Sequence, residues 1–222
     1  KIAFEISLGK EDGGFDSYEE VKYIISKMEN FCKDMDFPLP HFLVVRTGNH
    51  VMETKNVGSF ESIFFGKNQD ASKENLLKII SFCNQHGIMI KEHNADYLSD
   101  RALKLHPEIG IHAVNVAPEF AVVETKAFLS LLKKNQLEKE LEKFVEISYS
   151  SNKWKKWMLK DSKLGKQERA IISGHYIFGK KEFIDLKNDV ERKISLENTL
   201  DSYLKNEVKK SITRYLNLFS MI

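Results

Sequence analysis

The sequence predicts an α/β fold with a parallel β-sheet, followed by a purely helical C-terminal part. Short apolar runs alternate with segments of helical periodicity over residues 1–135, which is the pattern of successive β-α units. Helical segments follow one another over residues 136–222 without intervening strands. We therefore expect a β-α domain over 1–135 and a helical extension over 136–222 that packs on it.

The individual elements follow from periodicity and from residues that start or stop helices. Ser17 is suited to cap the first helix and Gly87 to terminate the second. Residues 49–71 are expected to form a long polar loop, and loops of such length are usually functional or disordered. We expect strands over 1–9, 41–48, 88–94 and 111–118, and helices over 17–35, 72–87, 98–110 and 119–135.

Composition limits the classes of partner. The chain has 222 residues, 42% hydrophobic and 30% charged, with a formal net charge of +2. This small net charge predicts neither a nucleic-acid nor a membrane partner, and no apolar run is long enough to cross a bilayer. The lysine-rich stretch NKWKKW at 152–157 is interpreted as a solvated helix face. The isolated cysteines Cys32 and Cys83 favour a reducing, cytoplasmic location.

Polar residues gather where the expected strands end, which is where β-α proteins carry their chemistry. Adjacent parallel strands lie about 4.8 Å apart. His50 and His93 are therefore expected to be neighbours, close enough to share a metal ion. Singly, each residue also has a structural interpretation: a strand-end histidine is often a hydrogen-bonded loop residue, Glu5 could face outward, and Asn115 could cap a helix. The strand-end group consists of Glu5, Gly48, Asn49, His50, Glu92, His93, Asn94, Asp96 and Asn115.

The remaining histidines have positions that favour structural or surface roles. Two of them lie at the amino ends of expected strands, and one lies near a helix C-terminus, where a cation suits the helix dipole. Another precedes a proline, and the last lies in the helical extension. These histidines are His41, His112, His86, His106 and His175.

Four segments resemble class II, zinc-dependent ketose-bisphosphate aldolases: FEISLGKEDGG (4–14), VVRTGNHVMETKNVGSF (44–60), IKEHNAD (90–96) and IHAVNVAPE (111–119). A more specific resemblance is to the family of the non-catalytic subunit of D-tagatose-bisphosphate aldolase. It rests on KEHNADY (91–97), HAVNVAPE (112–119), KWKKWM (153–158) and AIISGHYIF (170–178). The order and spacing of these segments cover most of the chain.

This resemblance implies a TIM barrel of the class II aldolase type, a fold with eight β-α units. Residues 1–135 would be its C-terminal half, the last four units, and residues 136–222 an extension on the barrel. The N-terminal half would then precede residue 1 or come from another aldolase chain. The resemblance also assigns roles: metal ligands His50 and His93, catalytic residues Glu5 and Asn115, and substrate-binding residues Gly48, Asn49, Asn94 and Asp96. The metal would be divalent, by preference zinc, with its third ligand outside this sequence.

The activity implied is zinc-assisted retro-aldol cleavage of a ketose phosphate or bisphosphate such as D-tagatose bisphosphate. Two departures from the family pattern predict a different mode of substrate binding: Ala117-Pro118 in the last strand segment, and Asn94-Ala95-Asp96 in place of a glycine-rich phosphate loop. The alternative is a non-catalytic subunit that stabilises a separate aldolase chain. In either case we expect an oligomer of like or unlike chains. A sugar-phosphate isomerase or kinase is a weaker alternative, and no Walker-type loop supports a kinase.

Overall fold

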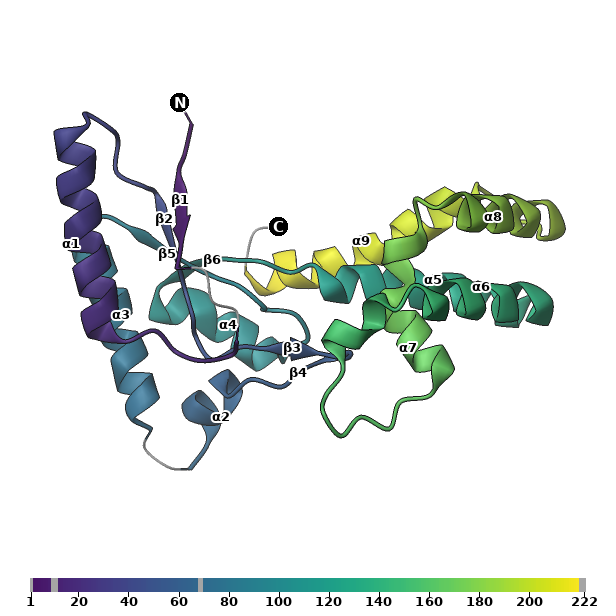
Figure 1. Ribbon diagram of the computed structural model, residues 1–222, viewed down its shortest axis with the longest axis horizontal. Helices are drawn as coiled ribbons and strands as arrows, with labels where there is room; N and C mark the ends of the chain where they lie inside the picture. Colours follow the sequence, from purple (N-terminus) through teal and green to yellow (C-terminus); the bar gives the residue numbers. More distant parts are fainter. Residues whose placement is uncertain (1, 9–11, 68–69, 220–222) are drawn as a thin grey trace. The chain divides into compact units, whose positions relative to one another are not determined.

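The computed structural model describes residues 2–8, 12–67 and 70–219. The chain divides into two compact units (Figure 1). The first unit comprises Lys1–Val51 and Asn56–Val116, and the second comprises Met52–Lys55 and Ala117–Ile222. None of the helices in the described ranges is both long and apolar enough to cross a membrane.

A parallel sheet forms the centre of the first unit, and this confirms the predicted α/β fold. Its strands pair in the order β1-β2-β5-β6. Glu5 of β1 is level with Phe42 of β2, and Val45 of β2 is level with Glu92 of β5. The carboxyl ends of β2 and β5 are therefore adjacent. The four strands are β1 Glu5–Ser7, β2 Phe42–Val45, β5 Met89–Glu92 and β6 Ile111–Val114.

The helices of the first unit pack apolar faces against the sheet. In α1, Val21, Ile25 and Met28 recur at helical spacing and are buried. Ser17 and Glu20 form a capping box at the start of this helix. Helices α1 and α3 lie side by side along the sheet (Figure 1). The bounds are α1 Tyr18–Asp34, α3 Ala71–Gln85 and α4 Asp100–Ile109.

The segment after β2, expected to be a long loop, contains regular structure. It forms a hairpin of β3 Val51–Met52 and β4 Lys55–Asn56, and then helix α2 Phe60–Phe65. Phe60 and Ile63 are buried and anchor α2. The prediction of an open loop over 49–71 was wrong for most of its length, because these apolar side chains give the segment its own core contacts. Residues 68–69 of that expected loop lie outside the described ranges.

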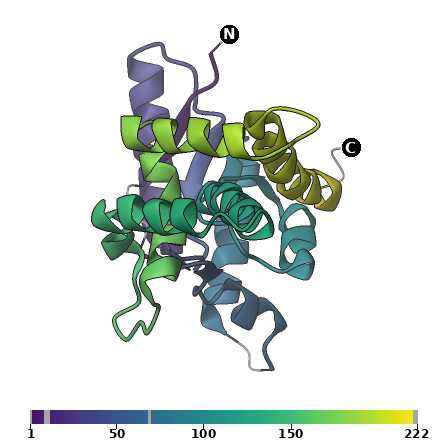
Figure 2. The same cartoon turned by 90° about the vertical axis from the view of Figure 1, so that its right-hand side faces the viewer.

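The second unit is helical around an aromatic core, and its helices are coloured from teal-green to yellow in Figure 2. Phe128, Phe144 and Phe183 pack with ring centroids 5.4–5.9 Å apart. We expected the division between the two parts after residue 135. By its packing against α6, α7 and α9, however, α5 belongs to the second unit. The elements are α5 Pro118–Lys134, α6 Glu138–Ser150, η1 Lys153–Trp157, α7 Lys166–Ser173, η2 Gly174–Ile177, α8 Lys181–Lys193 and α9 Leu200–Leu218.

Candidate functional site

The turn after β2 depends on a glycine. Gly48 has φ +86°, and a Cβ built there would lie 2.2 Å from the ring of Phe15. Its N–H donates to the carbonyl of Gly14, and its own carbonyl accepts from the N–H of Ser59. Gly48 thus holds three segments of backbone together, and this close packing gives the predicted substrate-binding residue a structural role.

A buried carboxylate lies at the carboxyl end of β5. Glu92 is fully buried, and its Oε1 accepts a hydrogen bond from Asn49 Nδ2 at 2.6 Å. The same oxygen lies 2.9 Å from Nε2 of the fully buried His106. Since β2 and β5 are neighbours, Asn49 and Glu92 reach each other directly across the ends of the two strands.

The surroundings of His106 favour the charged form of its ring. Its Nδ1 lies 2.7 Å from the carbonyl oxygen of Ala102, and its Nε2 faces the Glu92 carboxylate. Only an imidazolium can donate to two acceptors. Burial by itself lowers the pKa of His106, but the carboxylate of Glu92 outweighs it, and the pKa is raised above the ordinary value.

Two buried oxygens at these strand ends have no hydrogen-bond donor among the residues that the structure describes. They are Glu92 Oε2 and Asn49 Oδ1. A buried polar atom without a partner costs roughly 1–3 kcal/mol of stability, so such atoms are rare unless they have a purpose. Both are acceptors. The site is therefore suited to a group that donates hydrogen bonds, such as a hydroxyl or water.

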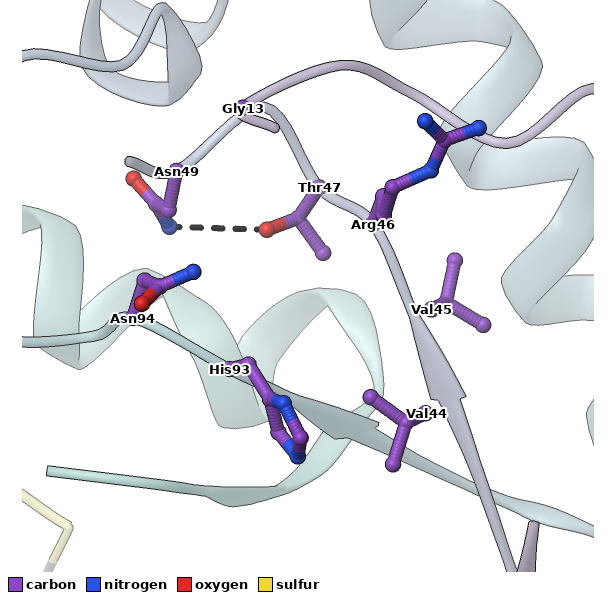
Figure 3. Close-up of a pocket in the computed structure, with 8 residues that line it drawn as sticks. All are labelled: Gly13, Val44, Val45, Arg46, Thr47, Asn49, His93 and Asn94. Atoms are coloured by element: carbon purple, nitrogen blue, oxygen red, sulfur yellow. Dashed lines mark hydrogen bonds between the residues drawn. The ribbon is translucent and has the colours of Figure 1, made fainter. Parts of the chain in front are cut away.

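A small cavity opens beside these residues (Figure 3). Its volume of about 20 Å³ suits one water-sized group. In Figure 3 the side-chain amides of Asn49 and Asn94 lie close to the Thr47 hydroxyl, and Asn49 Nδ2 is 3.5 Å from Thr47 Oγ1. The cavity is lined by Gly13, Val44, Val45, Arg46, Thr47, Asn49, His93 and Asn94.

One asparagine fixes the two loops that border the site. The side chain of Asn56 donates to the carbonyl oxygens of Asn94 at 2.8 Å and Asp96 at 3.1 Å. Its Oδ1 accepts from the backbone N–H groups of His50 and Gly58. Asn56, the last residue of β4, therefore links the loop after β2 to the loop after β5. This arrangement makes the rim of the site stiff before any ligand binds.

Arg46 fixes the backbone on the other side of the turn. Its Nε donates to Asp16 at 2.7 Å and its Nη1 to Asp12 at 2.9 Å, while Nη2 donates to the carbonyl of Phe15. The pKa of Asp12 is lowered, mainly by the hydrogen bond from the backbone N–H of Gly14 and next by Arg46. The donors of this guanidinium mainly hold the segment 12–16 in place.

The structure brings some of the predicted site residues together. Asn49, His93 and Asn94 all line the cavity. Asp96 is buried in the same loop, and its carbonyl is held by Asn56. His50 is only half-buried and does not line the cavity, and its Cβ lies close to Gly13, where an added Cβ would meet it at 2.7 Å.

Glu5 and Asn115 lie differently from the sequence expectation. Glu5 is the first residue of β1, and its carboxylate pairs with Lys91 Nζ at 2.6 Å. Its register with Phe42 places it at the amino end of the sheet, apart from the strand-end group. Asn115 follows β6, and its N–H donates to the carbonyl of Glu92. Its side chain is exposed, so its demonstrated contact is through the backbone.

The described residues do not by themselves make a metal site. Within these ranges, no group of three or more His, Cys, Asp or Glu side chains is arranged to hold an ion. Of the two predicted histidine ligands, His93 lines the cavity and His50 does not. The zinc site therefore stays a prediction that requires ligands from outside this sequence.

Sequence reasoning missed the roles of Glu92, His106 and Asn56, although signals for the first two exist. Glu92 has the same strand parity as the buried Ile90, so its side chain shares the inward face. His106 follows the buried residues Ala102 and Leu103 by four and three positions, which places it on the inner face of α4. A charged group at an inward position is the signal that could have identified both.

Comparison with known proteins finds solved structures with the same fold. No family model and no curated protein matches the chain. A probable tagatose 6 phosphate kinase from Sinorhizobium meliloti 1021 matches with a TM-score of 0.66 at 13% identity, covering 97% of this chain and 56% of that one. The fructuronate-tagaturonate epimerase UxaE from Cohnella laeviribosi, in a glycerol complex, matches with a TM-score of 0.62 at 11% identity, covering 98% and 45%.

These likenesses concern the fold. They confirm the resemblance to a tagatose-related protein at the level of structure. The chain spans about half the length of the solved structures it matches.

Proposed function

We propose that this chain supplies the keto-sugar-binding edge of a larger β-α barrel, completed by a polypeptide segment outside this sequence. The observation that carries the proposal is the pair of unused buried acceptors, Glu92 Oε2 and Asn49 Oδ1, at adjacent strand ends. A polyhydroxylated ligand is rich in the donors that these atoms lack. The solved structures of the same fold bear names of proteins that act on tagatose or tagaturonate, which supports this substrate class.

In this proposal some residues contact the ligand and others hold the loops in position. Glu92 and Asn49 would accept hydrogen bonds from sugar hydroxyls, while Asn94 and Thr47, which line the small cavity with Asn49, would contact the ligand at the border of that cavity. Asn56 would keep both loops in position. Because these groups are fixed by the fold, little side-chain entropy would be lost on binding.

The reaction that we propose for the completed barrel is cleavage of a carbon–carbon bond in a ketose phosphate, such as D-tagatose bisphosphate. A divalent metal, by preference zinc, would act as a Lewis acid that polarises the carbonyl. His93 and His50 are the candidate ligands in this chain, and at least one more ligand would come from the completing segment. Metal analysis of His50→Ala and His93→Ala proteins tests this part, which fails if bound zinc is unchanged in both.

An assay of the assembled barrel tests the binding role. We expect Asn49→Ala to raise the KM for D-tagatose bisphosphate by roughly tenfold or more, since it removes a buried hydrogen-bonding group that faces the ligand. Asn84→Ala, an exposed asparagine on α3, is the matched control and should leave KM within twofold. Release of triose phosphates is the readout. Equal KM values for the two variants would contradict the proposal.

The alternative is a non-catalytic subunit that stabilises a separate aldolase chain. Several apolar side chains in the first 39 residues are exposed, which favours it, since exposed apolar surface often meets a partner. The exposed fractions of Ile2, Tyr23 and Phe37 are 77%, 64% and 56%. In this case Asn49→Ala would not change the activity of the assembly, whereas Phe37→Ser would weaken co-purification with the aldolase chain.

A further inference from the structure

The second unit holds a cluster of aromatic rings and cations that the strand-end site does not use. We call it the tryptophan cluster: Tyr149, Trp154 and Trp157, with Tyr176 from η2. The rings of Tyr149 and Trp154 stack with centroids 5.2 Å apart. Trp157 Nε1 donates to the hydroxyl of Tyr176 at 3.2 Å. Since residues three apart lie above one another in a 3₁₀-helix, η1 presents both indoles on one face.

Cations cover the faces of these rings. The guanidinium of Arg169 lies 4.6 Å from the Trp154 ring centroid. The ammonium of Lys156 lies 4.9 Å from the Trp157 ring and 5.1 Å from the Tyr176 ring. Lys155 also approaches Trp154, at 5.9 Å. Each contact holds a positive charge at a fixed place on the surface of the second unit.

These charges are not neutralised by the chain. Lys166 pairs with Glu146, but in the described ranges no carboxylate forms an ion pair with Lys155, Lys156 or Arg169. The stretch 153–169 contains seven cations against two carboxylates, while the whole chain has a net charge of only +2. The stretch that carries Trp154, Trp157 and Arg169 is therefore far more positive than the chain as a whole.

Two buried nitrogens add to this evidence. Arg169 Nε and His175 Nδ1 are buried and have no hydrogen-bond partner among the described residues. The Arg169 atom is a donor that has no acceptor, so it is suited to an acceptor brought by a ligand. Burial and then the charge of Lys156 lower the pKa of His175.

We propose that the tryptophan cluster is a binding site for a phosphate group, contacted by Lys156, Lys155 and Arg169. A guanidinium and two ammonium groups supply the positive charge and the hydrogen-bond donors that phosphate oxygens require. A stacked nucleobase is disfavoured, because the ring faces of Trp154, Trp157 and Tyr176 already contact cations or other rings. The site offers charge and no open aromatic face. This inference stands whether or not the strand-end site binds a sugar.

Intrinsic fluorescence provides a direct test, because Trp154 and Trp157 are the two tryptophans of the chain. Inorganic phosphate is titrated into the full 222-residue chain at constant ionic strength set with sodium chloride. We expect a saturable change in emission. Lys156→Gln and Arg169→Gln should each weaken the affinity about tenfold, the effect of losing one charge-assisted hydrogen bond.

Two matched variants separate binding from folding and from general charge. Lys209→Gln removes an exposed charge from α9 and should leave the affinity within twofold. Lys156→Arg keeps the charge and should retain binding, and circular dichroism checks the fold of each variant. A linear response indistinguishable from chloride, or equal affinities for Lys156→Gln and Lys209→Gln, would overturn the proposal. So would a short DNA oligonucleotide that binds more than a hundredfold tighter than phosphate.

Discussion

The two units of this chain bury polar groups in different ways. In the first unit, ionisable side chains are buried: Asp16, Glu92, Asp96 and His106. In the second unit, Glu53 is the buried acidic residue among those described, and the polar core is made mainly of hydroxyls. Ser148, for example, donates to the carbonyl of Ala170 at 2.7 Å, which satisfies a helix carbonyl at little cost.

This difference indicates where each unit can act. Buried charges are costly unless they are paired and hydrogen-bonded, so they persist where the fold needs fixed charge away from water. The Glu92–His106 pair stands at the carboxyl edge of the sheet, where parallel-sheet proteins bind ligands. The second unit instead keeps its charges at the surface, around the tryptophan cluster. The first unit is suited to recognise hydroxyls, and the second to attract an anion.

The largest effect should come from removing the buried carboxylate. Glu92→Ala leaves the His106 cation buried without its partner, and Asn49 loses the acceptor of its side-chain amide. We expect a loss of about 3–5 kcal/mol in the free energy of unfolding. Urea unfolding followed by circular dichroism measures it.

The second unit supplies the matched control for that change. Ser148→Ala removes a buried hydroxyl and should cost only about 1 kcal/mol. Equal costs for Glu92→Ala and Ser148→Ala would show that the two units do not differ as described. Glu92→Gln, which keeps an acceptor oxygen for Asn49, should fall between the two variants.

Glycines provide the next comparison, because two positions each isolate one cause of strain and a third combines both causes. Gly48→Ala meets both a positive φ and an overlap with Phe15, so we expect a cost of about 2–4 kcal/mol. Gly87 has φ +68° with open space around it, so Gly87→Ala should cost only about 1 kcal/mol. Gly174→Ala in the second unit meets Thr125 Oγ1 at 2.4 Å without a positive φ.

The expected result is that the cost of Gly48→Ala approaches the sum of the other two. Thermal unfolding of the three variants at one pH gives the comparison. A cost of Gly48→Ala no larger than that of Gly87→Ala would mean that the Phe15 contact is loose, and that the turn after β2 is less rigid than the packing indicates.

Periodicity in the sequence predicted the four strands of the parallel sheet and most helices, because apolar spacing records which face is buried. It could not predict the hairpin and helix between Val51 and Phe65, where two-residue strands are too short to show a period. It also placed Glu5 with the strand ends, although pairing puts this residue level with the start of β2. Register depends on contacts between strands that are distant in sequence, and local patterns do not contain them.

The same limit explains the candidate site. The strand pattern placed Asn49, His93 and Asn94 near strand ends, and all three line the cavity. Glu92 was named among the strand-end residues without a role, and His106 was assigned a structural or surface role, because local patterns do not show which polar residues meet in the fold. The partnership of Asn56 with both loops could not be predicted at all, since it depends on a hairpin that only tertiary packing fixes.

The smallest effects are those of pH on the free energy of unfolding, and they should have opposite signs in the two units. The pKa of His106 is raised in the folded state by Glu92. Its stabilising contribution is therefore complete below the unfolded-state pKa of about 6.5 and is lost as the pH rises through the raised value. The pKa of His175 is lowered by burial and by Lys156. Its contribution is present above about pH 6.5 and is lost as the pH falls through the lowered value.

Urea unfolding of His106→Gln and His175→Gln at several values between about pH 5 and pH 8 compares the two signs. On acidification, the destabilisation caused by His106→Gln should grow, because the wild type gains the imidazolium–carboxylate pair that the variant lacks. The destabilisation caused by His175→Gln should shrink, because acid destabilises the wild type. The unfolded chain takes up a proton on His175 more readily than the folded chain, where the ring is buried beside Lys156. Parallel slopes would mean that the positive field at the tryptophan cluster is screened by solvent. The two units would then not differ as described, with a histidine beside a carboxylate in the first unit and a histidine beside the positive charge of Lys156 in the second.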